Sequence, residues 1–247
     1  ALADSYTVFR NGMFVSAGKI SDTTPEQMTS DMIGEIYAEK DLYEPRLLGE
    51  VVLELKNLTG TGFKNINLKV RKGEIVAFTG LAGCGASELM QTMFGVLPVT
   101  SGEVIVEGTS VRGNIKGFMR KKIAMLPSNR KENSVVPDLT IMENMYMAEH
   151  SLSGNKQVIR KNEEYERYQK YKDMLRIKAD SPDDPINSLS GGNQQKVFLA
   201  RWLNTGADVL LFDNPTQGVD VGAKEEIYQL ILQFAKEGKT VLINTLE

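Results

Sequence analysis

The chain of 247 residues is 41% hydrophobic and carries a formal net charge of −3 at neutral pH. This length allows one or two domains, each with a full apolar core. The weakly acidic balance gives no electrostatic reason to expect nucleic acid or an anionic membrane as a partner. No apolar run approaches the roughly 20 residues of a membrane-spanning helix, and a single cysteine excludes a disulfide framework. We therefore expect a soluble, cytoplasmic, globular protein.

The first residues predict a β-hairpin, a helix and a linker. Asn11-Gly12 separates two alternating runs, and this dipeptide is a strong signal for a two-residue hairpin turn. Thr24-Pro25 is typical of a helix start with proline in the first turn. Residues 37–49 are charged and contain a proline, which suits a linker.

From residue 51 onward, predicted strands alternate with predicted helices, which favours an α/β core with parallel strands. The charged stretch 161–172 reads as a solvated helix face, and the run 75–78 reads as a buried strand. We expect strands at 51–55, 66–70, 75–78, 103–106, 209–212 and 240–243. We expect helices at 87–94, over 140–178, out of the Gly-Gly turn at 191–192 and between the last two strands.

A glycine-rich loop follows the strand at 75–78 and has the G-x-x-x-x-G spacing of a phosphate loop. It consists of Gly80, Leu81, Ala82, Gly83, Cys84, Gly85, Ala86 and Ser87. Its glycines let the backbone approach a polyphosphate, and Ser87 stands where a hydroxyl binds Mg²⁺. On its own, the loop is as consistent with a plain glycine-rich turn. Ala86 replaces the expected lysine, and a charge-assisted hydrogen bond is worth ~1.5–3 kcal/mol.

An acidic residue, Asp213, closes the apolar run 209–212. The end of such a strand is where a phosphate-bound Mg²⁺ requires a ligand. The next residue in such a site is a carboxylate that polarises the attacking water. Asn214 cannot accept that proton and is silent as a general base.

The most specific signal is a short polar turn with two glycines at the start of a helix, a ready site for anions. The turn consists of Leu189, Ser190, Gly191, Gly192, Asn193 and Gln194. A serine-capped helix start explains only part of it, because it leaves the two adjacent glycines and the following Asn-Gln-Gln unexplained. Further on, we interpret Asp220 both as a helix cap and as an interface residue. His150 has no acidic or cysteine partner at ligand spacing and reads as a surface residue, and Cys84 reads as a small filler and not a nucleophile.

Together these motifs resemble an ATP-binding cassette (ABC). Residues from 51 to the end resemble the second cassette of the two-cassette ATPase subunit of bacterial ABC importers for monosaccharides, the ribose/galactose/xylose type. The resemblance rests on residues 189–197, 213–224 and 226–231. Residues 1–49 resemble the C-terminal hairpin of the first cassette with its linker, and residues 50–247 a second cassette truncated at its C-terminus.

The resemblance implies a P-loop NTPase-type cassette with a mostly parallel core sheet, an antiparallel β subdomain and a helical subdomain around 140–185. In this family each ATP, with Mg²⁺, lies between the phosphate loop of one cassette and the Ser-Gly-Gly turn of the other. The motif positions imply Ser87 and Asp213 as metal ligands, and three departures weaken this chain's own site. Ser128 replaces a glutamine, Asn214 a glutamate and Leu246 a switch histidine. An adenine-stacking aromatic is not evident before Phe63, which we read as core.

The implied function is to energise sugar import, mainly by lending the Ser190 turn to another cassette, with the isolated chain nearly inactive as an ATPase. The implied partners are the first cassette of the same polypeptide or a homodimer, transmembrane permease subunits and, indirectly, a sugar-binding protein. The implied location is the cytoplasmic face of the membrane. Two alternatives are a non-hydrolysing regulatory nucleotide-binding module and a soluble ABC protein acting on ribosomes or DNA. The acidic charge and the lack of a basic insertion count against the second.

Overall fold

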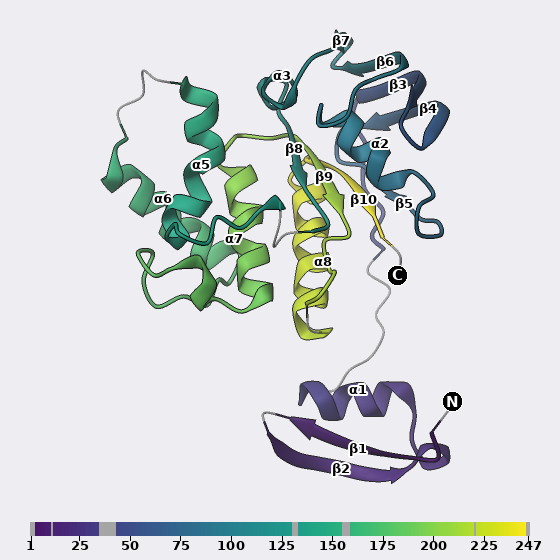
Figure 1. Cartoon of the computed structure of the whole chain (residues 1–247), viewed down its shortest axis with the longest axis vertical. Helices are drawn as coiled ribbons and strands as arrows, with labels where there is room; N and C mark the ends of the chain where they lie inside the picture. Colours follow the sequence, from purple (N-terminus) through teal and green to yellow (C-terminus); the bar gives the residue numbers. More distant parts are fainter. Residues whose placement is uncertain are drawn as a thin grey trace.

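The computed structural model describes residues 3–10, 12–34, 43–129, 133–154, 159–219 and 221–245. At the N-terminus, β1 (Ser5–Arg10) pairs antiparallel with β2 (Met13–Lys19), and a 3-10 helix (Ile20–Asp22) leads to α1 (Pro25–Ile33). The Thr24 side chain accepts a hydrogen bond from the Gln27 backbone, so α1 begins where the sequence predicts. Figure 1 shows α1 lying along this hairpin. The predicted hairpin and helix are therefore confirmed.

The central sheet is parallel, with the strand order β5-β10-β9-β8. Its strands are β5 (Ile75–Phe78), β8 (Ile123–Leu126), β9 (Val209–Asp213) and β10 (Thr240–Asn244). Asn244 lies opposite both Asp213 and Phe78, and all strand pairs are parallel, so the carboxyl ends meet at one edge. The reading of residues 75–78 as a buried strand is wrong, because β5 is an edge strand with Ala77 exposed.

A second sheet is antiparallel, with the order β4-β3-β6-β7. It comprises β3 (Val51–Gly60), β4 (Phe63–Arg71), β6 (Ser101–Val106) and β7 (Thr109–Val111). The first two strands are longer than the sequence predicts. Their hydrogen-bonded pairing continues through register shifts, beyond the residues in which apolar and polar side chains alternate. Helix α2 (Ala86–Met93) packs between the two sheets, where Met90 and Met93 are fully buried.

The remaining helices form an arm and one cover of the parallel sheet (Figure 1). They are α3 (Ile115–Arg120), α5 (Ile141–Ser153), α6 (Lys161–Met174), α7 (Gly191–Leu203) and α8 (Val221–Lys236), with a 3-10 turn at Ile186–Ser188. The predicted helical stretch 140–178 contains two helices, α5 and α6. Within the described ranges, no helix combines the length and apolar composition needed to cross a bilayer.

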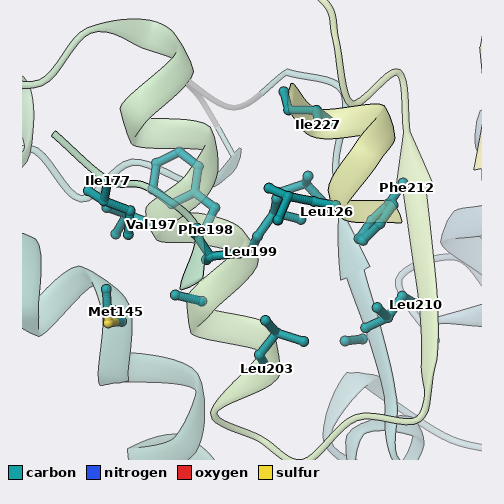
Figure 2. Close-up of a cluster of buried hydrophobic side chains, with 14 of the residues drawn as sticks. Leu126, Met145, Ile177, Val197, Phe198, Leu199, Leu203, Leu210, Phe212 and Ile227 are labelled. Atoms are coloured by element: carbon teal, nitrogen blue, oxygen red, sulfur yellow. The ribbon is translucent and has the colours of Figure 1, made fainter. Parts of the chain in front are cut away.

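Helix α7 joins the arm to the sheet through a continuous apolar core (Figure 2). Phe198 and Val197 are fully buried on α7, and Phe212 of β9 lies in the same cluster. Burying a large apolar side chain contributes about 1.5–3 kcal/mol, so the orientation of α7 is fixed by several such contacts.

Two features of the arm depart from the expectations. The His150 ring is half-buried, and its Nε2 lies 2.6 Å from Glu164 Oε1, so the reading of His150 as a surface residue is wrong. The sequence does not predict this partner, because Glu164 lies on α6, one helix further along the chain. Helix α6 is solvated as predicted over most of its length, but Glu164 and Tyr168 are buried against α5.

Candidate functional site

Three side chains meet at the carboxyl edge of the parallel sheet. Asp213 ends β9 and is 1% exposed, Asn244 ends β10, and Ser87 lies in the first turn of α2. Ser87 Oγ donates to Asp213 Oδ1 at 2.9 Å. The carboxyl edge of such a sheet is where α/β folds bind ligands.

Asn244 contributes an amide to this group that the sequence analysis did not identify as a site residue. Its Nδ2 donates to Asp213 Oδ1 at 2.7 Å and to Ser87 Oγ at 3.1 Å. The signal in the sequence was a polar residue at the end of an apolar strand, the same signal that identified Asp213. The contact itself depends on the parallel register, which places Asn244 directly opposite Asp213.

The glycine-rich loop lies between β5 and α2 and is exposed from residue 79 through residue 84. Gly83 and Gly85 have φ values of 79° and 93°, in the left-handed region that favours glycine. A Cβ on Gly85 would lie 2.4 Å from the Gly62 carbonyl oxygen, so the hairpin of the antiparallel sheet packs directly on the loop. Cys84 is exposed. The loop presents exposed backbone together with the Leu81 side chain, which is 87% exposed.

Asn214 continues the chain after Asp213 in a left-handed conformation, with φ 47°. Its backbone N–H donates to Asn244 O at 2.8 Å, and its Nδ2 lies 3.4 Å from Asp213 Oδ1. The Asn214 amide thus faces the Asp213 carboxylate, the group at the metal-ligand position, and supplies no basic oxygen. Ser128 lies half-buried after β8, at the same sheet edge but across β9 from Asn244. Asp220 and Leu246 lie outside the described residues.

The Ser190 turn opens α7 at the surface. Ser190 is exposed, and its Oγ accepts from Asn193 Nδ2 at 3.0 Å and from the Asn193 backbone at 3.5 Å. Asn193 Oδ1 in turn accepts the Lys178 backbone N–H at 2.8 Å. Gln194 Nε2 donates to the carbonyl oxygens of residues 186 and 189. Hydrogen bonds therefore hold the turn to neighbouring backbone, while Ser190 at the helix N-terminus is exposed.

Two side chains of α7 link the helix that begins at the Ser190 turn to neighbouring segments. Gln195 is buried, and its Nε2 donates to Pro215 O at 2.8 Å. Lys196 Nζ contacts Glu226 Oε2 on α8 at 2.5 Å and donates to Arg176 O at 3.1 Å. The partners of both side chains are distant in the chain, so these contacts have no local signal in the sequence.

The fit to Mg²⁺ depends on the atoms around Asp213. Mg²⁺ in nucleotide sites is held by one or two protein oxygens together with phosphates and water. Ser87 and Asp213 supply oxygens of that type, but an amide N–H donor of Asn244 is bonded to both. The residues as arranged do not fit a Mg²⁺ ion. Among the described residues, His, Cys, Asp and Glu side chains form no group of three or more suited to a metal.

The fold and the site define an ATP-binding cassette of the P-loop NTPase class. Its parts are a glycine-rich loop before α2, an acid at the end of β9, an antiparallel sheet, and a helical arm next to α7, which begins at the Ser190 turn. The family model for ABC transporters matches residues 63–217, and the chain belongs to that family. Residues 51–62, the N-terminal hairpin and α8 lie outside the matched range.

Several curated proteins and solved structures are similar to the chain. The arabinose import ATP-binding protein AraG of Azospirillum brasilense is 37% identical over 98% of the chain, which covers 47% of that protein. The ribose import ATP-binding protein RbsA of Bacillus licheniformis is 38% identical over 98% of the chain, covering 50% of it. The chain thus spans about half the length of these relatives.

The dimeric structure of the bacterial ABC transporter cassette MJ0796 superposes with a TM-score of 0.68 at 27% identity, covering 79% of this chain and 88% of that one. The post-hydrolysis structure of MJ0796 with ADP and phosphate gives 0.66 at 26% identity over the same shares. These likenesses agree with the ABC cassette fold that the sequence predicts.

Proposed function

We propose that the chain is the second nucleotide-binding cassette of a two-cassette ATPase subunit that energises monosaccharide import. In this proposal residues 50–247 form that cassette, and residues 1–49 form the tail of the preceding cassette and the linker. The names of the similar arabinose and ribose import proteins support a pentose or related sugar transporter. The partners are the preceding cassette, transmembrane permease subunits and a sugar-binding protein, and the subunit works at the cytoplasmic face of the membrane.

The cassette acts chiefly by presenting its Ser190 turn to an ATP held by the partner cassette. The observation that carries this proposal is the contrast between the Ser190 turn and the chain's own nucleotide site. The turn keeps an exposed serine at the N-terminus of α7, and a helix N-terminus binds anions through backbone N–H groups and the helix dipole. The chain's own site lacks a lysine at Ala86 and a base at Asn214, and its metal acid is bonded within the protein.

The decisive variant is Gly191→Val in the assembled two-cassette subunit. A branched side chain at Gly191 blocks close approach of the backbone to a phosphate. Removing one such stabilising donor typically costs about 10²–10³ in turnover, so we expect ATPase activity to fall by at least about a hundredfold. Gly117→Val is the matched control, because Gly117 also lies in a helix and a Cβ there meets only the Arg112 carbonyl oxygen at 3.8 Å. Full activity of the Gly191→Val subunit contradicts the trans role.

The isolated chain should hydrolyse ATP only at background rate and bind it weakly. Phosphoryl transfer relies on cations and on a base that activates an oriented water. Ala86 supplies no cation, and Asn214 supplies no base. Groups that act as a unit are strongly non-additive. The single variants Ala86→Lys and Asn214→Glu should therefore restore little turnover in a phosphate-release assay. Robust turnover by the unmodified, repurified chain contradicts this part of the proposal.

A further inference from the structure

We propose that Asn244 closes the metal position of this cassette, so that its own phosphate loop takes a nucleotide without Mg²⁺. The inference rests on the proposed assignment of Ser87 and Asp213 as the metal-type ligands of that loop. It concerns the side chain at the end of β10, a position outside the glycine-rich loop, the Ser190 turn and the Asp213-Asn214 pair.

The geometry around Asp213 Oδ1 carries the proposal. This one oxygen lies 2.9 Å from Ser87 Oγ, 2.7 Å from Asn244 Nδ2 and 3.4 Å from Asn214 Nδ2. Asn244 Nδ2 is also 3.1 Å from Ser87 Oγ, so the two oxygens and the amide nitrogen form a closed triangle. A Mg²⁺ ion lies about 2.0–2.1 Å from each oxygen ligand. On the side that Asn244 faces, an ion bound to both oxygens would overlap the amide.

The direction of the Asn244 amide is set by its neighbours. Asp213 Oδ1 is an acceptor. If the amide were flipped, the carbonyl oxygen of Asn244 would face this acceptor with no proton between the two oxygens. With the nitrogen in that place, the amide presents two positive N–H ends to Ser87 and Asp213. A cation and an N–H donor compete for the same lone pairs, so the arrangement disfavours the ion electrostatically as well as sterically.

Burial makes this competition costly to reverse. Asp213 and Asn244 are 1% and 4% exposed. A buried carboxylate requires partners, since an unpaired one carries a large desolvation penalty. Here amide and hydroxyl donors bond Asp213 Oδ1, and the strand carrying Asn244 is fixed by pairing with β5 and β9 on both sides. A nucleotide at the loop is left with the backbone N–H groups and the helix dipole of α2 as its binding elements.

The test compares ATP binding by the chain in EDTA and in Mg²⁺, using titration calorimetry. For the parent chain we expect the same dissociation constant in both buffers. Asn244→Ser removes most of the amide and keeps a polar atom, and here we expect Mg²⁺ to tighten ATP binding by about tenfold or more, equivalent to about 1.4 kcal/mol. Asn244→Val is the second variant, and its far-ultraviolet circular dichroism verifies folding.

A matched double variant identifies the position of the metal. Adding Ser87→Ala to Asn244→Ser removes one of the two oxygens and should abolish the Mg²⁺ gain. Electron paramagnetic resonance of Mn²⁺ with ADP gives a second readout, with bound Mn²⁺ expected for Asn244→Ser and not for the parent chain. Tighter binding of Mg-ATP than of ATP by the parent chain overturns the inference, as does a folded Asn244→Ser variant without a Mg²⁺ gain. Neither result touches the trans role, which is tested separately at Gly191.

Discussion

The change Asn144→Ala tests how the helical arm is held to the helix that carries the Ser190 turn. Asn144 is fully buried at the start of α5. Its Nδ2 donates to the carbonyl oxygens of Val136, Leu139 and Thr140 at 3.0, 3.2 and 3.0 Å. Its Oδ1 accepts the Val136 backbone N–H at 3.1 Å and Arg201 Nη2 of α7 at 3.1 Å. One amide thus links a loop, α5 and α7.

The expected loss of stability follows from which partners keep another bond. The three carbonyl oxygens also accept backbone N–H groups, so losing the Asn144 amide as a donor costs them little stability. The Val136 N–H loses its acceptor, which costs about 1–3 kcal/mol. Burial lowers the pKa of Arg201 to about 10, so its guanidinium depends on acceptors, and losing a bond to a charged group costs about 1.5–3 kcal/mol. We expect Asn144→Ala to lower the free energy of unfolding by about 3–5 kcal/mol.

Urea denaturation followed by circular dichroism and by Trp202 fluorescence measures this loss. Asn162→Ala is the matched control, because Asn162 is exposed on α6 and the same change there should stay within about 0.5 kcal/mol. A loss below about 1 kcal/mol for Asn144→Ala would refute the reasoning. Such a result would mean that water or a local shift replaces the bonds of this amide.

Three further outcomes are expected from denaturation experiments. Gly85→Ala should destabilise the chain more than Gly83→Ala, because both positions have positive φ but only the first places a Cβ 2.4 Å from the Gly62 carbonyl oxygen; equal losses would contradict the clash. Thr140→Ala removes the capping box of α5 and should cost about 1 kcal/mol, and no change would contradict the cap. Hydrogen bonds from the Thr140 backbone N–H and, to a smaller extent, from its hydroxyl lower the pKa of Glu143. The stability that Glu143 adds is therefore present above the unfolded pKa of about 4.3 and is lost as the pH falls through the lower folded pKa. Glu143→Gln should therefore weaken the acid dependence of the urea midpoint, and an unchanged profile would contradict this linkage.

The parts that the sequence could predict are those with a local chemical signature. The Asn-Gly hairpin, the Thr24 cap and the Ser190 cap act within a few residues, and the structure has each of them. The acid after the apolar run 209–212 was predictable because strand and acid are adjacent. The parallel order of the strands followed from their alternation with helices.

The parts that could not be predicted depend on contacts between distant segments. Periodicity does not show which strands have neighbours, so the edge position of β5 was missed, and the four-residue strand β8 was too short to identify after a basic stretch. His150 and Glu164 meet only because α5 and α6 pack together. Asn244 reaches Asp213 only through the register of β10 on β9, so its place at the end of an apolar strand did not show which side chains it would contact.

The most direct measurement of the central proposal is vanadate-dependent photocleavage of the assembled two-cassette subunit. Vanadate trapped beside ADP takes the place of the γ-phosphate, and ultraviolet light then cleaves the polypeptide backbone next to it. The proposal predicts a cut at Ser190, whose turn faces the partner's nucleotide, and no cut in the loop from Gly80 to Ser87. Cleavage within that loop, with Ser190 intact, would contradict the proposal and would make this cassette a holder of hydrolysable ATP.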